Sequence, residues 1–117
     1  MIPIKNFLDY RKYLLEFYEA KRQENRFFSY RYMAKRLGID HAYILRVLGR
    51  KSHLADRYIG QFSLLCGFNG SDAEYFRTLV RFNKSKDKEE AANLLEKLTA
   101  ISGVDEVLPS GDAERCL

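Results

Sequence analysis

The sequence predicts an all-α fold of five to six helices, and three observations lead to this prediction. Apolar residues recur every three or four positions in six segments, as in helices that bury one face. No segment alternates apolar and polar residues as a half-buried strand does, and no internal repeat is present. With 117 residues, of which 46% are hydrophobic and 31% charged, the chain has the size and balance of one folded domain.

The first predicted helix covers residues 6–25, with Asn6 as its N-terminal cap. One apolar stripe runs along this helix and consists of Phe7, Tyr10, Leu14, Phe17 and Tyr18. The opposite face mixes acidic and basic residues, which weakens adhesion to anionic lipid. We therefore expect this helix to pack against the protein core, and we predict no membrane partner.

Residues 29–50 are expected to form two short helices joined by a tight turn, the arrangement of a helix-turn-helix. Ser29 is placed to cap the first helix, and Gly38 can adopt the positive φ at which that helix ends. Asp40 is placed to cap the second helix, at about residues 41–49. The residues expected to hold the two helices together are Met33, Ala34, Leu37, Ile44, Val47 and Leu48.

Three further helices complete the predicted domain, at about residues 56–66, 71–83 and 87–101. Ser71 and Glu74 have the spacing of a capping box at the start of the fifth helix. From residue 102 onward, Gly, Ser, Pro and Asp occur without periodicity. We therefore predict one helical domain over residues 1–101, followed by a flexible C-terminal tail over residues 102–117.

The sequence has none of the common signatures of an enzyme. Phosphate-binding and dinucleotide-binding glycine loops, the HExxH zinc motif and the GxSxG nucleophile motif do not occur. The two histidines are twelve residues apart, and Cys66 and Cys116 lack metal-ligand spacing. We therefore predict no catalytic residues, no metal site, no cofactor and no small-molecule ligand. No apolar run is long enough for a membrane span or a signal peptide, so we expect a cytoplasmic protein.

Positive charge is concentrated in the first half of the chain. Residues 1–60 contain 13 Lys or Arg and 6 Asp or Glu, a net charge of +7, whereas residues 61–117 contain 7 and 10, a net charge of −3. Between Arg26 and Lys51, seven basic residues accompany a single acid, Asp40. Such an excess attracts phosphate groups, although solvated helix faces also carry basic residues. Together with the helix-turn-helix, this charge predicts double-stranded DNA as the partner.

In a helix-turn-helix that binds DNA, the second helix enters the major groove and its first turn meets the base edges. The residues predicted to contact bases are therefore His41, Ala42, Tyr43 and Arg46. Arg46 can offer a bidentate fork to guanine, and Ala42 is small enough to contact a thymine methyl group. The residues predicted to contact phosphates are Ser29, Tyr30, Arg50, Lys51 and His53.

Residues 30–51 resemble the lambda-repressor-like (Xre-type) helix-turn-helix. The resemblance rests on five positions at fixed spacing, which are Ala34, Gly38, Ile39, Ile44 and Val47. It implies a lambda-repressor-like DNA-binding domain. Over about residues 6–100, the chain also resembles the N-terminal part of a bacterial paralogous family of transcriptional regulators. Because members of that family continue into a larger C-terminal domain, the resemblance implies a free-standing, shortened or truncated regulator.

The sequence leaves two points open. A helix-turn-helix also occurs as a plain packing motif, so the alternative function is a helical protein–protein interaction module, for dimerisation or as an adaptor, without DNA binding. The leucine face of residues 87–101, formed by Leu94, Leu95 and Leu98, is expected to pack on the first helix or to support a homodimer. A third interpretation is that this segment once led to a further domain. The loop after the second helix is the other open point, because Gly49 lies one residue before the glycine usual in Xre-type sequences and Arg50 occupies that position.

Overall fold

The computed structural model describes residues 2–107, and all regular structure in that range is helical. This confirms the all-α prediction of five to six helices. In chain order the elements are a 3-10 turn η1 (Ile4–Asn6), α1 (Tyr10–Glu24), α2 (Tyr30–Leu37), α3 (His41–Leu48), a 3-10 turn η2 (Asp56–Tyr58), α4 (Ile59–Cys66), α5 (Gly70–Lys84) and α6 (Lys88–Val107). None of the described helices combines the length and the apolar character needed to cross a membrane.

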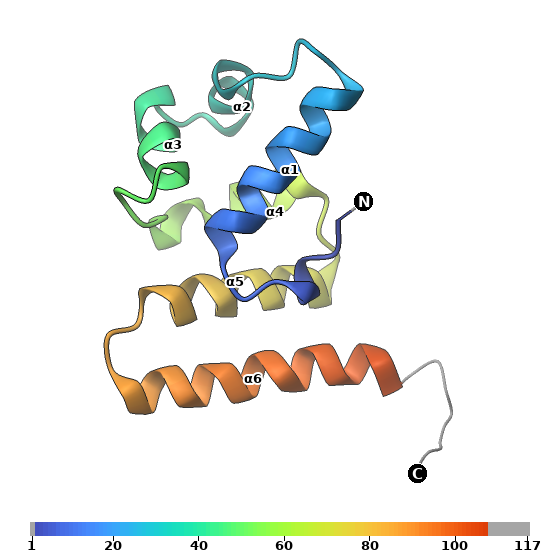
Figure 1. Cartoon of the computed structure of the whole chain (residues 1–117), viewed down its shortest axis with the longest axis vertical. Helices are drawn as coiled ribbons and strands as arrows, with labels where there is room; N and C mark the ends of the chain where they lie inside the picture. Colours follow the sequence, from blue (N-terminus) through green and yellow to red (C-terminus); the bar gives the residue numbers. More distant parts are fainter. Residues whose placement is uncertain (1, 108–117) are drawn as a thin grey trace.

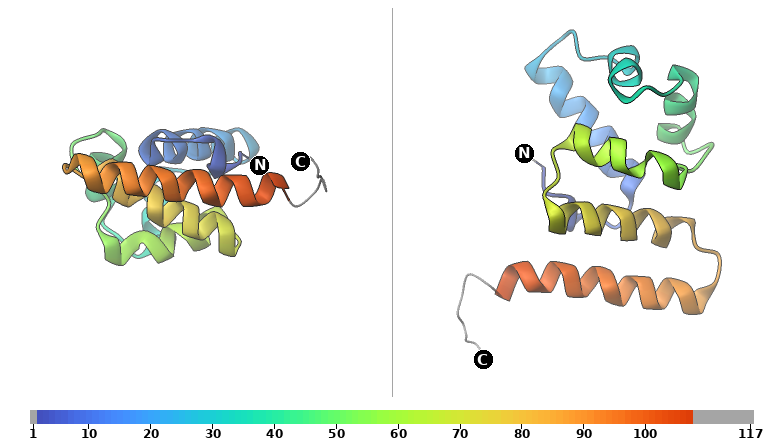
Figure 2. Two further views of the ribbon diagram at one scale, coloured as in Figure 1. Left: turned by 90° about the horizontal axis from the view of Figure 1, so that it is seen from below. Right: turned by 180° about the vertical axis from the view of Figure 1, so that it is seen from behind.

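The helices are arranged in a flattened molecule with two distinct ends. α5 and α6 run antiparallel at one end, and α2 and α3 form the other end (Figure 1). α1 and α4 lie between the ends on opposite broad faces, as the two views in Figure 2 show. The α2–α3 pair is therefore far from α6, and α4 has one side that no other helix covers.

The core is rich in aromatic residues from α1, α4 and α5. Tyr10, Tyr13, Phe62 and Phe76 are each no more than 1% exposed. Burying a large apolar side chain contributes about 1.5–3 kcal/mol to stability, so these side chains account for much of the driving force for folding. The residues predicted to hold α2 against α3 are buried as expected, except that Leu48 is only half-buried.

α1 starts later than predicted. It begins at Tyr10 rather than at residue 6, because Asp9 is the better cap. The Asp9 carboxylate accepts hydrogen bonds from the backbone N–H groups of Arg11 at 3.0 Å and Lys12 at 3.3 Å. Asn6, the predicted cap, lies instead in the 3-10 turn η1.

Of the other predicted caps, the one at Ser71 is wrong and the one at Asp40 is right in position only. α5 begins at Gly70 and is capped by Asn69, whose Oδ1 accepts a hydrogen bond from the N–H of Asp72 at 2.8 Å, so the capping box predicted at Ser71 is not used. Asp40 directly precedes α3, but its side chain makes no capping hydrogen bond. The backbone N–H groups in the first turn of α3 therefore receive no hydrogen bond acceptor from the Asp40 side chain.

α6 continues through Val107, beyond the end predicted at residue 101. Gly103 costs the helix about 1 kcal/mol relative to alanine, which is too little to end a helix that is packed on its neighbours. Leu98 is 1% exposed, and the Ser102 hydroxyl donates to the Lys5 carbonyl at 3.4 Å. The flexible tail predicted over residues 102–117 is thus wrong for its first six residues, and residues 108–117 lie outside the described range.

Candidate nucleic-acid interface

α2 and α3 are joined by a tight turn at Gly38. This glycine has a φ of 69°, in the left-handed region, and the N–H of Ile39 donates to the carbonyl of Ala34 at 3.0 Å. Ile39 itself is buried beneath the turn. In Figure 1, α2 is seen nearly end-on whereas α3 lies in the plane of the view, so the two axes cross steeply. α3 lies at the edge of the molecule, with one side open to solvent.

Three exposed residues, Ala42, Leu45 and Arg46, form the open side of α3, which we call the outer face. Ile44 and Val47, on the opposite side, are each 1% exposed and face the core. Of the predicted base contacts, Ala42 and Arg46 therefore lie where a partner could reach them.

The predicted base contacts omit Leu45, which is 42% exposed on the outer face. It follows Ala42 by three positions and directly precedes Arg46, so helical spacing alone could have identified it. An exposed apolar side chain at this place can contact a thymine methyl group. His41, the first residue of α3, is half-buried and lies beside the outer face.

Tyr43 does not belong to the outer face, contrary to the prediction. It precedes Val47 by four positions, so its half-buried ring lies on the packed side of the helix. Its hydroxyl accepts a hydrogen bond from the N–H of Ala55 at 2.8 Å and donates one to the carbonyl of His53 at 3.1 Å. The ring centre also lies 5.8 Å from the Arg46 guanidinium, a cation–π contact that orients the arginine. Tyr43 therefore lies behind the outer face and is not part of it.

The two predicted phosphate contacts at the start of α2 have structural roles. Ser29 caps α2, as predicted, because its Oγ accepts a hydrogen bond from the N–H of Tyr32 at 3.1 Å. Tyr30 is half-buried and stacks on Tyr18, with ring centroids 4.0 Å apart and 8° between the ring planes. The cap uses the Ser29 oxygen as an acceptor, so its hydroxyl proton is available to a phosphate. Tyr30 is the weaker candidate of the two.

Side chains from three helices hold the loop after α3, residues 49–55, which we call the clamped loop. From α1, the Tyr10 hydroxyl accepts a hydrogen bond from the N–H of Leu54 at 2.8 Å, and Arg11 donates to a loop carbonyl at 3.1 Å. From α5, Lys84 donates to the Leu54 carbonyl at 2.9 Å. From α3, the Tyr43 hydroxyl makes the two hydrogen bonds to the loop that are described above. The basic residues of this loop therefore belong to a backbone segment that several hydrogen bonds hold in place.

Arg50 has a φ of 65° and is the one non-glycine residue with a positive φ among those the structure describes. The N–H of Lys51 donates to the carbonyl of Arg46 at 2.8 Å, and the N–H of Arg50 donates to that of Val47 at 3.1 Å. These two bonds close α3 in a Schellman motif. α2 and α4 also end in the left-handed conformation, but each has a glycine at this position. Arg50 therefore stands where glycine is favoured.

We expect an Arg50→Gly protein to be more stable than an Arg50→Ala protein by about 1 kcal/mol. Both variants lose the arginine side chain, but only glycine removes the steric cost of the left-handed backbone. Urea denaturation of the two proteins measures the difference in their free energies of unfolding. A more stable alanine variant, or two equally stable variants, would contradict the left-handed conformation of this residue.

The Arg50 guanidinium pairs with the carboxylate of Asp9, the residue that caps α1. Partial burial raises the pKa of Asp9. Hydrogen bonds from Arg50 and the backbone outweigh this effect and hold the pKa below its usual value. Since the Arg50 side chain is 54% exposed, the pair contributes only about 0–1 kcal/mol, so a phosphate can compete for the arginine. Lys51 is exposed, and none of the ion pairs found between described residues involves it.

His53, a predicted phosphate contact, is half-buried and bonded within the chain. Its Nδ1 lies 3.0 Å from the Tyr10 hydroxyl, which accepts a hydrogen bond from the loop backbone and therefore has its proton free for the imidazole. Burial, and then the positive charges of Arg11 and Lys84, lower the pKa of His53 below its ordinary value of 6.5. The imidazole is thus mainly neutral at pH 7, and it anchors the clamped loop rather than attracting a phosphate.

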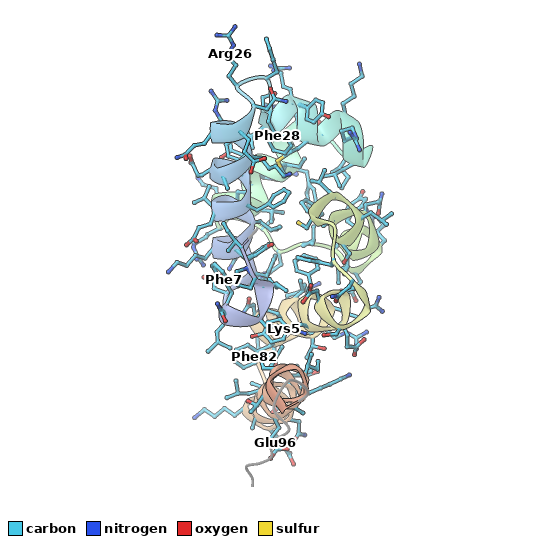
Figure 3. All side chains as sticks on the ribbon, turned by 90° about the vertical axis from the view of Figure 1, so that its right-hand side faces the viewer. Lys5, Phe7, Arg26, Phe28, Phe82 and Glu96 are labelled. Atoms are coloured by element: carbon cyan, nitrogen blue, oxygen red, sulfur yellow. The ribbon has the colours of Figure 1, made fainter. Side chains whose placement is uncertain are left out.

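Exposed basic residues are concentrated at the end of the molecule that contains α2 and α3. Figure 3 shows Arg26 at the end that contains α2 and Glu96 on α6 at the other end. Basic residues that are exposed on α2 and α3 are Arg31, Lys35, Arg36 and Arg46. The end that carries the outer face therefore also carries the positive charge that attracts phosphates.

Comparisons of the chain with protein families, with curated proteins and with solved structures find no match. The function is therefore inferred from three features of the molecule: the outer face of α3, the clamped loop and the distribution of charge. The outer face and the exposed basic residues of α2 and α3 lie at one end of the fold, and the clamped loop leads from α3 to the side chains of α1 and α5 that hold it.

Proposed function

We propose that the chain binds double-stranded DNA in a sequence-specific manner and acts as a transcriptional regulator. The observation that carries this proposal is the exposure of the outer face of α3 directly before a rigid loop bearing Arg50 and Lys51. An α-helix with its side chains is about 10–12 Å across, which matches the width of the major groove. In this arrangement, outer-face side chains contact base edges while the loop contacts phosphates. The resemblance of residues 30–51 to the lambda-repressor-like helix-turn-helix supports the same proposal.

The outer face combines one polar contact with two apolar ones. Arg46 can donate two hydrogen bonds to the O6 and N7 atoms of guanine, and its contact with the Tyr43 ring limits the conformations that it must lose on binding. Ala42 and Leu45 present methyl groups that suit the methyl group of thymine. Arg50 and Lys51 supply charge that fixes the position of the protein on the DNA without reading its sequence.

The alternative function, a helical protein–protein interaction module without DNA binding, requires an exposed surface that is poor in charge. The outer face of α3 does not meet this requirement, because basic residues surround it. A surface of that kind does occur on α4, which lies elsewhere on the molecule (Figure 2). Contact with a protein through α4 and contact of DNA with the outer face of α3 would therefore use different helices and do not exclude each other.

Titrations against a duplex selected from a random pool and against an unselected duplex test the proposal. We expect tighter binding to the selected duplex. If about three phosphates are neutralised, the logarithm of the binding constant should fall against that of the salt concentration with a slope of about −2.7. This slope corresponds to about a 40-fold loss of affinity between about 50 and about 200 mM salt.

The matched variant for this test is Arg50→Gly, because glycine suits the backbone at that position. It should reduce the salt slope by about 1 while leaving the preference for the selected duplex unchanged, as expected for a phosphate contact. Failure of the wild-type protein to bind any duplex at low salt would refute DNA binding and favour the interaction-module alternative.

A further inference from the structure

α4 has an exposed side that carries no charge. Residues 58–71 include all of α4 and contain no Lys, Arg, Asp or Glu, whereas 14 residues at the chain average of 31% would include about four. Leu64, on this side, is 84% exposed, the highest value among the large hydrophobic residues that the structure describes. Depletion of charge around an exposed large apolar residue is typical of the centre of a protein interface.

Leu64 lies beside a hollow in the surface. The hollow has a volume of about 220 Å³, and its walls come from the C-terminal part of α2 and from α4, with Arg36, Leu37, Gln61 and Leu65 among its lining residues. It adjoins a second hollow of about 300 Å³, which shares Arg36 and Leu65. The lining of this second hollow also includes Phe17 and Phe28 and, from the end of α1, the charged residues Lys21 and Glu24. A projecting leucine next to a hollow of this size can fit a second copy of the same surface.

We infer that α4 forms the contact between two copies of this chain. In a two-fold dimer the same surface faces itself, so the Leu64 side chain of each copy enters the hollow of the other. α4 itself carries no charge, so the two α4 helices do not repel each other, and the charged residue that lines the hollow, Arg36, comes from α2. Gly60, one turn before Leu64, has open space where a Cβ would stand, which allows the helices to approach closely. Figure 2 shows that no other helix of the chain covers this side of α4.

The leucine face of α6, the surface predicted to support a homodimer, is a poorer candidate because it is mostly used within the chain. Leu98 is 1% exposed and Leu94 is half-buried, which leaves Leu95 at 40% exposure. The neighbouring Glu96 and Lys97 are exposed, so a second copy would have to bury or pair their charges. A partner protein that is recognised through its charge would find no opposite charge on α4. A second copy of the chain needs no opposite charge there, because its own α4 is uncharged as well.

The contact is small. A helix of eight residues is about 12 Å long, so the two hollows and α4 together bury less than the roughly 1,200–2,000 Å² of a standard protein–protein interface. We therefore expect a weak dimer, with a dissociation constant on the order of 0.1 mM in the absence of DNA. The inference does not depend on the proposed DNA binding, because it concerns the free protein.

Sedimentation equilibrium of the full chain without DNA, from about 10 µM to about 1 mM, tests this inference. In a Leu64→Lys variant the new charge meets Arg36 of the second copy, so we expect association to weaken by at least about tenfold. The matched control is Leu95→Lys, which adds the same charge at an exposed leucine of α6 and should leave association unchanged. Circular dichroism should show that both variants fold, because both leucines are exposed.

Three results would overturn the inference. The first is a wild-type chain that stays monomeric up to about 1 mM. The second is association of the Leu64→Lys protein that equals that of the wild type, which places any dimer contact elsewhere. The third is an equal or greater loss of association in the Leu95→Lys protein, which indicates a contact through α6 or general charge repulsion.

Discussion

Replacement of Arg46 by alanine is expected to weaken binding to the selected duplex by about 1–3 kcal/mol, or about 5- to 150-fold. Arg46 is the one residue of the outer face able to donate two hydrogen bonds to a guanine, and it is exposed in the free protein. Because these bonds are made only with the correct base, affinity for an unselected duplex should fall much less. Fluorescence anisotropy titrations with both duplexes measure the two affinities.

Two control variants separate base recognition from charge. Arg77→Ala removes the same charge from an exposed position on α5, so the preference for the selected duplex should be unchanged. Arg46→Lys keeps the charge but lacks the planar fork, so it should retain affinity for the unselected duplex and lose the preference. Equal losses of preference in the Arg46→Ala and Arg77→Ala proteins would show that the outer face of α3 does not read bases.

Replacement of Tyr10 by phenylalanine is expected to reduce the free energy of unfolding by about 1–3 kcal/mol. The Tyr10 side chain is fully buried, and its hydroxyl accepts a hydrogen bond from the N–H of Leu54, a residue that is itself 0% exposed. Phenylalanine fills nearly the same volume but leaves this N–H and the Nδ1 atom of His53 without their partner. Thermal unfolding should show a midpoint lower by at least about 4 °C.

Tyr58→Phe is the matched control for this prediction. Tyr58 precedes α4, is half-buried and packs on the Tyr43 ring at a centroid distance of 5.5 Å. Its hydroxyl takes part in none of the hydrogen bonds found between described residues, so removing the oxygen should change stability by less than about 0.5 kcal/mol. If Tyr10→Phe and Tyr58→Phe have equal effects, the buried hydrogen bond of Tyr10 does not stabilise the clamped loop.

The helices and the buried sides of α2 and α3 could be predicted because they depend on local spacing. Met33 and Leu37 are one turn apart, as are Ile44 and Val47, and all four are buried. A helix with such a stripe must cover it, whatever the rest of the fold does. The ends of the helices were harder to predict, since several residues near each end could serve as caps and the fold selects among them.

The outer face of α3 was predictable in part. Ala42 and Arg46 are exposed as expected, but Tyr43 was assigned to this face by its chemical type, which suits contact with nucleic acid. The partners of its hydroxyl, at His53 and Ala55, belong to a loop whose path the sequence does not reveal. Leu45 was overlooked because an apolar residue in a helix is first expected to be buried.

The clamped loop could not be predicted, because the groups that hold it are far apart in the sequence. Tyr10 and His53 are 43 positions apart, and Lys84 and Leu54 are 30 positions apart. Only the packing of α1 and α5 around the loop brings them together. The left-handed conformation of Arg50 likewise follows from the hydrogen bonds that end α3 and not from the residue itself.

By itself, the sequence determined the six helices found in residues 2–107, the apolar set through which α2 and α3 pack, and the concentration of positive charge in the half that contains them. The tertiary structure alone decided which side chains remain available to a partner. Tyr43 and His53 are used within the chain, whereas Leu45 and Leu64 are exposed. The physical reason is that helical periodicity is set by residues three and four positions apart, whereas burial and hydrogen bonding depend on which helices become neighbours in space.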